Sequence, residues 1–188
     1  MTNKVKKSKK QIPRKKSIKP NVQTKTKPDL SDNTFTFDFR DNRWLSGTKV
    51  DKFTNKLKDV ETYSKFITII LGKIIPEVQD KSKDIKRSQA SSFHCHPIEQ
   101  GEDAYKTIIK IMRKIYGVSF EKSIDKNEQI YQMGVVGGIR IIALRNKKTN
   151  VIRPLFIDYH HLAYPDVKYN QTDYLKQEFC PISQYISR

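Results

Sequence analysis

The sequence lacks the features that mark extracellular and membrane-spanning proteins. Its 188 residues include only two cysteines, Cys95 and Cys180, which are too few for a disulfide framework and favour a reducing compartment. No apolar run approaches the length of a bilayer-spanning helix, and the amino-terminal segment has no apolar core of the kind that a secretory signal requires. We therefore expect a cytoplasmic protein that does not engage membranes.

Sequence motifs for several common chemistries are missing as well. Gly134, Gly137 and Gly138 are not part of a GxxxxGK phosphate loop or of a strand–GxGxxG–helix unit, so we interpret them as a bulge or tight hairpin. No EF-hand, HExxH or paired-cysteine spacing indicates a metal site, and no internal repeat is visible. Clues to function must come from the charge and from the histidines.

Positive charge is abundant and unevenly distributed. The formal net charge is +17, and residues 1–30 hold ten lysines and Arg14 against the single Asp29, a net +10 that leaves +7 for the rest. Residues 1–32 are too polar to offset the entropy of ordering, so we predict a disordered basic tail followed by a single domain over 33–188. Such a tail is typical of proteins that bind RNA, DNA or ribosomes, and a solubilising or targeting extension is the alternative.

Hydrophobic periodicity predicts an α+β fold with an N-terminal strand and helices packed on an antiparallel sheet. The strands rest on alternating or β-branched residues, and the helices on apolar residues spaced three or four apart. Pro97 closes the short second strand or places it at an edge. The expected elements are a strand at 34–40, one or two helices over 51–76 with a break near 59–62, a helix end and surface loop over 77–90, a short strand at 93–98, a helix at 102–116 ending at Gly117, a three-stranded meander at 130–136, 139–144 and 151–157, and a closing helix or irregular tail at 172–186.

All four histidines fall in two short stretches, HCHPI (94–98) and DYHHLAYPD (158–166). On an extended strand His94 and His96 point to the same face, and Asp158 and His160 do the same, with His161 on the opposite face unless the strand ends there. The four imidazoles and the carboxylate converge if the strand at 93–98 lies beside the strand at 151–161. A zinc site is one interpretation, although HxH is a short and common spacing and Cys95 would point away from it.

Metal-free acid–base chemistry on RNA is the second interpretation. Imidazoles suit both proton transfers because the ordinary histidine pKa of about 6.5 leaves both forms available. Arg140, Arg145 and Arg153 lie on neighbouring predicted strands and could stabilise a phosphate, while Tyr159 or Tyr164 could stack on a base or donate a proton. The alternative for each of these residues is structural: a histidine satisfied by backbone, an arginine on a solvated sheet face, or a tyrosine packed in the core or its rim.

The stretch YQMGVVGGIRIIALRNKKTNVIRPLFIDYHHLAYPD resembles the C-terminal sheet of RelE-like toxins of toxin–antitoxin systems. The F-x-F start, HCHPI and DxxHxxYP together also resemble an uncharacterised group of small proteins of phages and mobile elements. His94 and His160 fall outside both resemblances and are auxiliary, and the chain departs from typical RelE-like toxins in its greater length and basic tail. The positions that carry the resemblances are His96 with Pro97, Arg140, Asp158, His161, Tyr164 and Pro165.

With the clustered histidines, this likeness implies a RelE-like endoribonuclease of a toxin–antitoxin or phage-defence system that needs no metal or other cofactor. His96 and His161 would be the acid–base pair in either order, and Asp158 would orient an imidazole. Arg140 and Arg153 would hold the phosphate and Tyr164 would contact the substrate. RNA or the ribosome would be the target, and an antitoxin protein or RNA a partner. A non-enzymatic nucleic-acid-binding protein of a mobile element explains the charge equally well.

Overall fold

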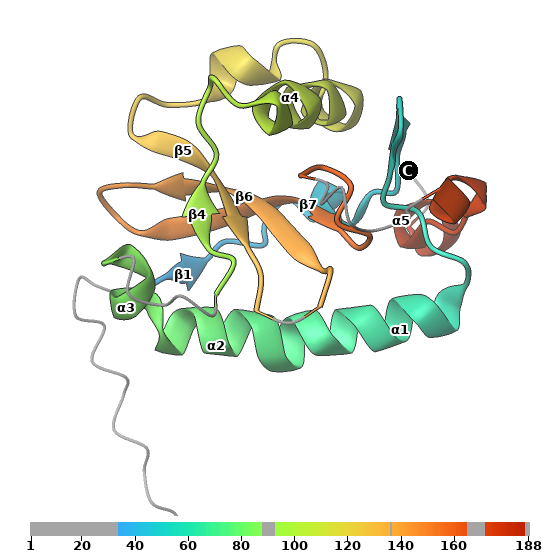
Figure 1. Ribbon diagram of the computed structural model, residues 1–188, viewed down its shortest axis with the longest axis horizontal. Coiled ribbons are helices and arrows are strands. Elements are labelled where there is room, and N and C mark those ends of the chain that lie inside the picture. The colour runs from blue at the N-terminus through green and yellow to red at the C-terminus, as the bar shows by residue number, and fades with distance from the viewer. Residues whose placement is uncertain (1–33, 88–92, 136, 165–171, 187–188) are drawn as a thin grey trace, which may run out of the picture.

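A five-stranded mixed sheet lies at the centre of the protein, whose computed structural model describes residues 34–87, 93–135, 137–164 and 172–186 (Figure 1). The strand order is β1-β7-β6-β5-β4. Strands β4 to β7 pair in antiparallel fashion, and the meander β5–β6–β7 confirms that prediction, whereas β1 lies parallel to β7. The sheet is therefore mixed, not antiparallel throughout. Its strands are β1 (Thr36–Phe37), β4 (His96–Pro97), β5 (Glu128–Met133), β6 (Arg140–Asn146) and β7 (Val151–Asp158).

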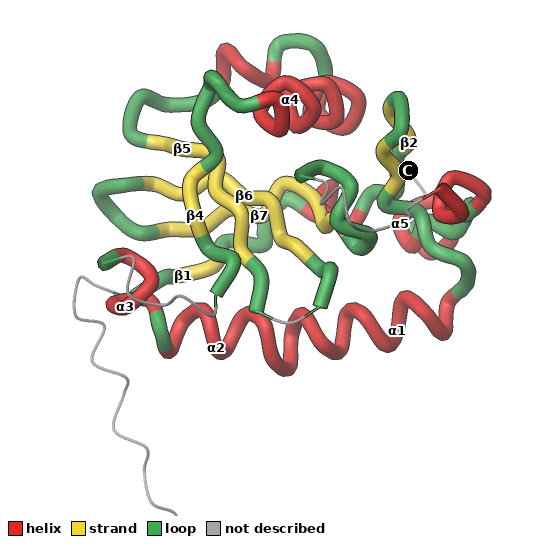
Figure 2. The backbone as a smooth tube through the Cα atoms, in the orientation of Figure 1, coloured by secondary structure: helices red, strands yellow, loops and turns green. Residues whose placement is uncertain are grey.

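Helices cover both faces of this sheet (Figures 1 and 2). One face packs on a continuous rod made of α1 (Val60–Ile69), the π-helical turn η2 (Ile70–Ile74) and α2 (Ile75–Asp80), and the other on α4 (Asp103–Tyr116). Alternate residues of β6 enter the two cores, because side chains alternate along a strand. The register of β6 and β7 shifts between Ile142 and Ala143, so that the consecutive Leu155 and Phe156 are both buried in the α4 core.

The rod begins later than the apolar spacing predicts, and its end at Asp80 lies within the helix end expected over 77–90. Residues 51–58 are not helical: they contribute to a hairpin of β2 (Lys49–Val50) and β3 (Phe53–Thr54), whose turn uses Asp51 at a φ of 51°. The helix starts after Asp59, which accepts a hydrogen bond from the Thr62 amide at 2.8 Å. The expected break near 59–62 is thus the true N-terminus of the helix.

Pro76 does not end the rod. It lies in the first turn of α2, directly after the π-helical turn that precedes it in the rod. The preceding π turn connects the two α-helices, with the Ile75 amide donating to the Ile70 carbonyl. A further short helix, α3 (Ser82–Lys86), occupies part of the region expected to be a surface loop.

The remaining elements complete the layers. Helix α4 ends at Gly117, which has a φ of 99°, as predicted for a terminating glycine. The first strand is shorter than expected, with Phe35 buried, Phe37 half-buried and Phe39 exposed. Among the described residues, no helix is long and apolar enough to cross a membrane. The predicted tail, residues 1–32, lies outside the described residues. Short helices are η1 (Asn42–Leu45), η3 (Phe120–Ser123), η4 (Thr172–Lys176) and α5 (Pro181–Tyr185).

Candidate functional site

The two histidine stretches do not lie on adjacent strands, because β5 and β6 separate β4 from β7. The condition for a direct convergence of all four imidazoles is therefore not met. A row of residues nevertheless crosses the sheet at one end. The His94 amide donates to the Gly134 carbonyl at 2.9 Å, Gly134 lies against Arg140, and Arg140 is paired with Asp158. This sheet end, residues 94–96, 132–135, 137–140 and 158–164, brings together most of the predicted site.

Arg140 is a buried member of this row, with only 3% of its surface exposed. Its Nη1 donates to the carbonyls of Gly137 at 2.7 Å and Ile139 at 3.0 Å, so the guanidinium ties down the turn between β5 and β6. Burial lowers the pKa of Arg140, and the nearby Asp158 opposes that shift. This guanidinium is sealed in the protein, which does not fit the expected role of gripping a substrate phosphate at the surface.

Asp158 organises the loop that follows β7 and does not orient an imidazole through any of its hydrogen bonds in the described structure. Its carboxylate accepts from the amides of His160 at 3.2 Å, Leu162 at 3.0 Å and Ala163 at 2.7 Å. Burial raises the pKa of Asp158, while these three amides and Arg140 act in the opposite direction. The loop 159–164 is consequently folded back over the sheet end.

This folded loop brings Tyr164 to His96, with ring centroids 5.8 Å apart in an edge-on contact. The His96 ring is half-buried and both of its nitrogens are engaged. Nδ1 lies 2.9 Å from the Pro97 carbonyl and donates to it, and Nε2 lies 3.2 Å from the Gln132 amide nitrogen and accepts from it. These contacts engage both ring nitrogens of His96 with protein groups.

The other histidines differ in their surroundings. His94 is exposed overall. Its pKa is lowered, first by the burial of part of its ring and then by the positive charges of Arg140 and His96. His160 is buried, donates from Nε2 to the Lys56 carbonyl at 2.9 Å and stacks on Tyr174 at 4.1 Å. His161 has a φ of 59°, and its Cβ lies 3.7 Å from where a Cβ on Gly138 would be. His160 is therefore a packing residue, whereas His94, His96 and His161 belong to the sheet end.

Arg153 lies far from Arg140 along the same strand pair. It is opposite Leu144, which lies four positions along β6 from Arg140, roughly 13 Å at the rise of a strand. Arg140 donates to the carbonyls of its own turn and Arg153 pairs with Glu128, so the two guanidiniums do not converge on one phosphate site as expected. Of the two other candidates, Tyr159 is buried and stacked on Phe66 at 5.5 Å, and Arg145 packs on the Phe35 ring at the opposite end of the sheet.

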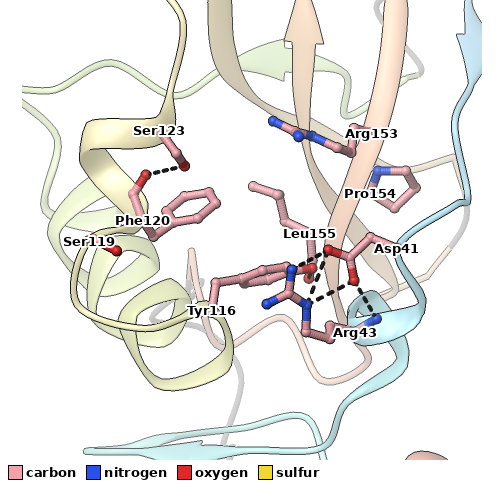
Figure 3. Close-up of a pocket in the computed structure, with 9 residues that line it drawn as sticks. All are labelled: Asp41, Arg43, Tyr116, Ser119, Phe120, Ser123, Arg153, Pro154 and Leu155. Carbon is pink, nitrogen blue, oxygen red and sulfur yellow. Dashed lines mark hydrogen bonds and ion pairs between the residues drawn. The ribbon is translucent and has the colours of Figure 1, made fainter.

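Arg153 instead lines a pocket of about 230 Å³ between β7, η1 and the end of α4 (Figure 3). Arg43 lies on the same pocket, paired with Asp41 at 2.6 Å and stacked 4.4 Å from the centroid of the Tyr116 ring. Arg153 itself pairs with Glu128 at 3.2 Å. Each guanidinium on this pocket thus already has a carboxylate partner.

Several of these residues were not anticipated from the sequence. Gln132 hydrogen-bonds to His96. The feature of the sequence that could have indicated it is a polar residue two positions after the buried Ile130, on the same face of the same strand. Arg43 and Tyr116 carry no local signal, because they come from segments more than seventy positions apart. Within the described ranges, no group of three or more histidine, cysteine, aspartate or glutamate side chains is arranged to hold a metal ion.

Comparisons with known proteins point to one family. A family model described as "Uncharacterised protein UU032" matches residues 40–187. The chain is also 30% identical over 168 residues to the "Uncharacterized protein UU032" of Ureaplasma parvum serovar 3, covering 89% of each chain. No solved structure matches.

Proposed function

We propose that this chain, which belongs to the family described as Uncharacterised protein UU032, is an RNA-binding protein that does not cleave its ligand. The observation that carries the proposal is the excess of positive charge in both parts of the sequence, +10 in residues 1–30 and +7 in the remainder. A polyanion releases its condensed counterions when lysines and arginines neutralise its phosphates, and this release drives binding. RNA in the cytoplasm, free or in ribosomes, is the partner we favour.

The geometry of the sheet end supports binding over cleavage. A general base needs a ring nitrogen that can reach the proton it removes, but both nitrogens of His96 contact protein groups. The carboxylate of Asp158 is occupied by three backbone amides, and Arg140 is buried against the carbonyls of its own turn. These three residues have structural tasks that account for their presence.

The test is to incubate the purified full-length protein with single-stranded RNA in EDTA, and in parallel with added zinc. We expect intact RNA in both, with an affinity that falls steeply as salt rises. Cleavage in EDTA would replace this proposal by metal-independent catalysis, and cleavage only with zinc would replace it by metal-dependent catalysis. Absence of binding at low salt would reject an RNA ligand.

A second candidate is the RelE-like, metal-independent endoribonuclease of a toxin–antitoxin or phage-defence system. The contact of His96 with Tyr164, at the same sheet end as His94 and His161, favours it, because several proton-transferring groups then lie near one surface. In that case single changes His96→Ala and His161→Ala would abolish RNA cleavage and growth arrest on induction. Full activity of both folded variants would eliminate this candidate.

A further inference from the structure

Two positively charged side chains lie over one buried aromatic ring at the end of the sheet opposite His94, and the charge of a third, Lys83, acts on one of them. Lys86 Nζ lies 5.3 Å and Arg145 Cζ lies 5.1 Å from the centroid of the Phe35 ring, and Phe35 is fully buried. Lys83 is one turn before Lys86 on α3 and is exposed. We call Lys83, Lys86 and Arg145 the Phe35 cluster.

The protein holds Arg145 firmly in this place. Its guanidinium also lies 5.4 Å from the Tyr131 ring centroid, and Nη2 donates to the side-chain carbonyl of Asn150 at 3.3 Å. The buried Nε of Arg145 has no hydrogen-bond partner in the described structure. The guanidinium thus keeps a positive charge at a position where a leucine or methionine packed on the same rings would supply none.

The position of α3 is fixed as well. The Gln79 side-chain amide at the end of α2 donates to the Phe35 carbonyl at 3.2 Å, which ties the rod to the segment before β1. The lysines of α3 are therefore carried to the same ring that Arg145 covers. Figures 1 and 2 show α3 beside β1 at this end of the sheet.

The cluster concentrates like charges. Burial, then the charge of Arg145 and then that of Lys83, lowers the pKa of Lys86. Neither Lys83 nor Arg145 takes part in any of the ion pairs formed among the described residues. Cations brought together in this way repel one another in the unbound protein, and an anion placed between them relieves that repulsion.

We propose that the Phe35 cluster is a binding site for backbone phosphates of single-stranded RNA. The inference rests on the proposed RNA-binding function and names where on the folded domain the strand is held. A guanidinium fixed on two rings has already lost its rotamer freedom, which lowers the entropic cost of gripping a phosphate. Phosphodiester groups repeat along the strand, so adjacent cations can each take one.

A further observation extends the site along a strand: the exposed Lys147 and Lys148 follow Arg145 in the turn between β6 and β7.

The experiment compares RNA affinity across salt concentrations for the full-length protein and three variants. Lys83→Gln removes an exposed cation of the cluster, Arg145→Gln removes the fixed one, and Lys73→Gln, an exposed lysine on the rod, is the matched control. Loss of one phosphate contact to single-stranded RNA reduces the slope of log K against log salt by about 0.7 and weakens binding about fivefold at 0.1 M salt. We expect this for the first two variants and an unchanged slope for Lys73→Gln.

Lys83 has no packing role, so Lys83→Gln keeps the test decisive if Arg145→Gln fails to fold. Equal slopes for Lys83→Gln, Lys73→Gln and the unmodified protein would overturn the site while leaving RNA binding intact. Failure of the unmodified protein to bind RNA would instead reject the proposed function itself. The two failures are therefore distinguishable in one set of titrations.

Discussion

Arg140 lies across the backbone of Gly134, so closely that a Cβ on Gly134 would come within 2.7 Å of Arg140 Cδ and 2.9 Å of its Nη1. The absence of a side chain at Gly134, directly after β5, gives Arg140 of β6 its route to the carbonyls of the turn. The glycine is needed here for space, since its φ is not in the left-handed region. The sheet end around His94 and Asp158 thus depends on one missing side chain.

We predict that Gly134→Ala lowers the free energy of unfolding by about 1–3 kcal/mol, the usual cost of overpacking a buried position. The buried guanidinium must move and lose at least part of its hydrogen bonding to Gly137 and Ile139. Urea denaturation followed by circular dichroism measures the change. Gly72→Ala is the control, because nothing lies within 4 Å of its Cβ and the helical position should gain about 0.5–1 kcal/mol. Equal stability of the two variants would contradict the prediction.

Asp158→Asn should cost about 3 kcal/mol of unfolding free energy. The new amide NH2 faces one of the three backbone N–H donors, and the neutral side chain no longer compensates the buried Arg140. We also expect faster proteolysis within residues 159–164, because their fold depends on this carboxylate. Asp103→Asn, at an exposed carboxylate paired only with Lys106, is the matched control and should leave both measurements unchanged. A variant at 158 as stable as this control would disprove the role of Asp158 in the loop.

The sequence predicted the elements whose pattern is local. The meander was recognisable because β-branched runs were separated by turn residues, and the end of α4 because a glycine follows the apolar stripe. The hairpin at 49–54 was mistaken for helix because Phe53, Leu57 and Val60 share the spacing of one helical face. Apolar spacing alone cannot separate a helix from a short hairpin, and here the evenly spaced residues do not share one surface: Phe53 enters the α4 core, Leu57 enters the core under the rod, and Val60 is exposed.

The site was harder to predict because it depends on strand order. Neighbouring histidines in the sequence suggested neighbouring strands, but two strands intervene, and contact between the two histidine stretches is made by the returning loop through Tyr164. Arg140 and Arg153 both face the α4 side, yet they lie at opposite ends of β7's pairing with β6. The face of the sheet on which a side chain lies follows from alternation along its strand. Its position relative to residues of the neighbouring strand follows from the register, which a single sequence does not reveal.

His160 should make stability depend on pH. Burial lowers its pKa in the folded protein, whereas the unfolded chain has the ordinary value near 6.5. Between those two values the unfolded chain binds more protons, so the free energy of unfolding must fall as pH decreases below about 6.5. His160→Phe keeps a ring against Tyr174 but cannot titrate. We therefore expect a flatter stability profile between pH 7 and 5 for this variant, measured by urea titrations. Parallel profiles would show that His160 does not titrate as its burial requires.

Tyr116 lines the pocket that Arg43 and Arg153 also line, and different substitutions can remove its two contacts one at a time. Its hydroxyl donates to the Leu155 carbonyl at 2.8 Å, and its ring lies under the Arg43 guanidinium. Tyr116→Phe keeps the ring and should cost about 1 kcal/mol of unfolding free energy for the lost hydrogen bond. Tyr116→Leu should cost more, because it also removes the aromatic face.

A double-mutant cycle with Arg43→Met isolates the ring contact. We expect a coupling free energy of about 0.5–1 kcal/mol between Arg43→Met and Tyr116→Leu, and none between Arg43→Met and Tyr116→Phe. The reason is that Tyr116→Leu removes the π-system and Tyr116→Phe keeps it. Urea denaturation of the four proteins of each cycle gives both values. A coupling of the same size in the two cycles would mean that Arg43 acts through the hydroxyl or through Asp41, and the pocket wall would then be held by hydrogen bonds alone.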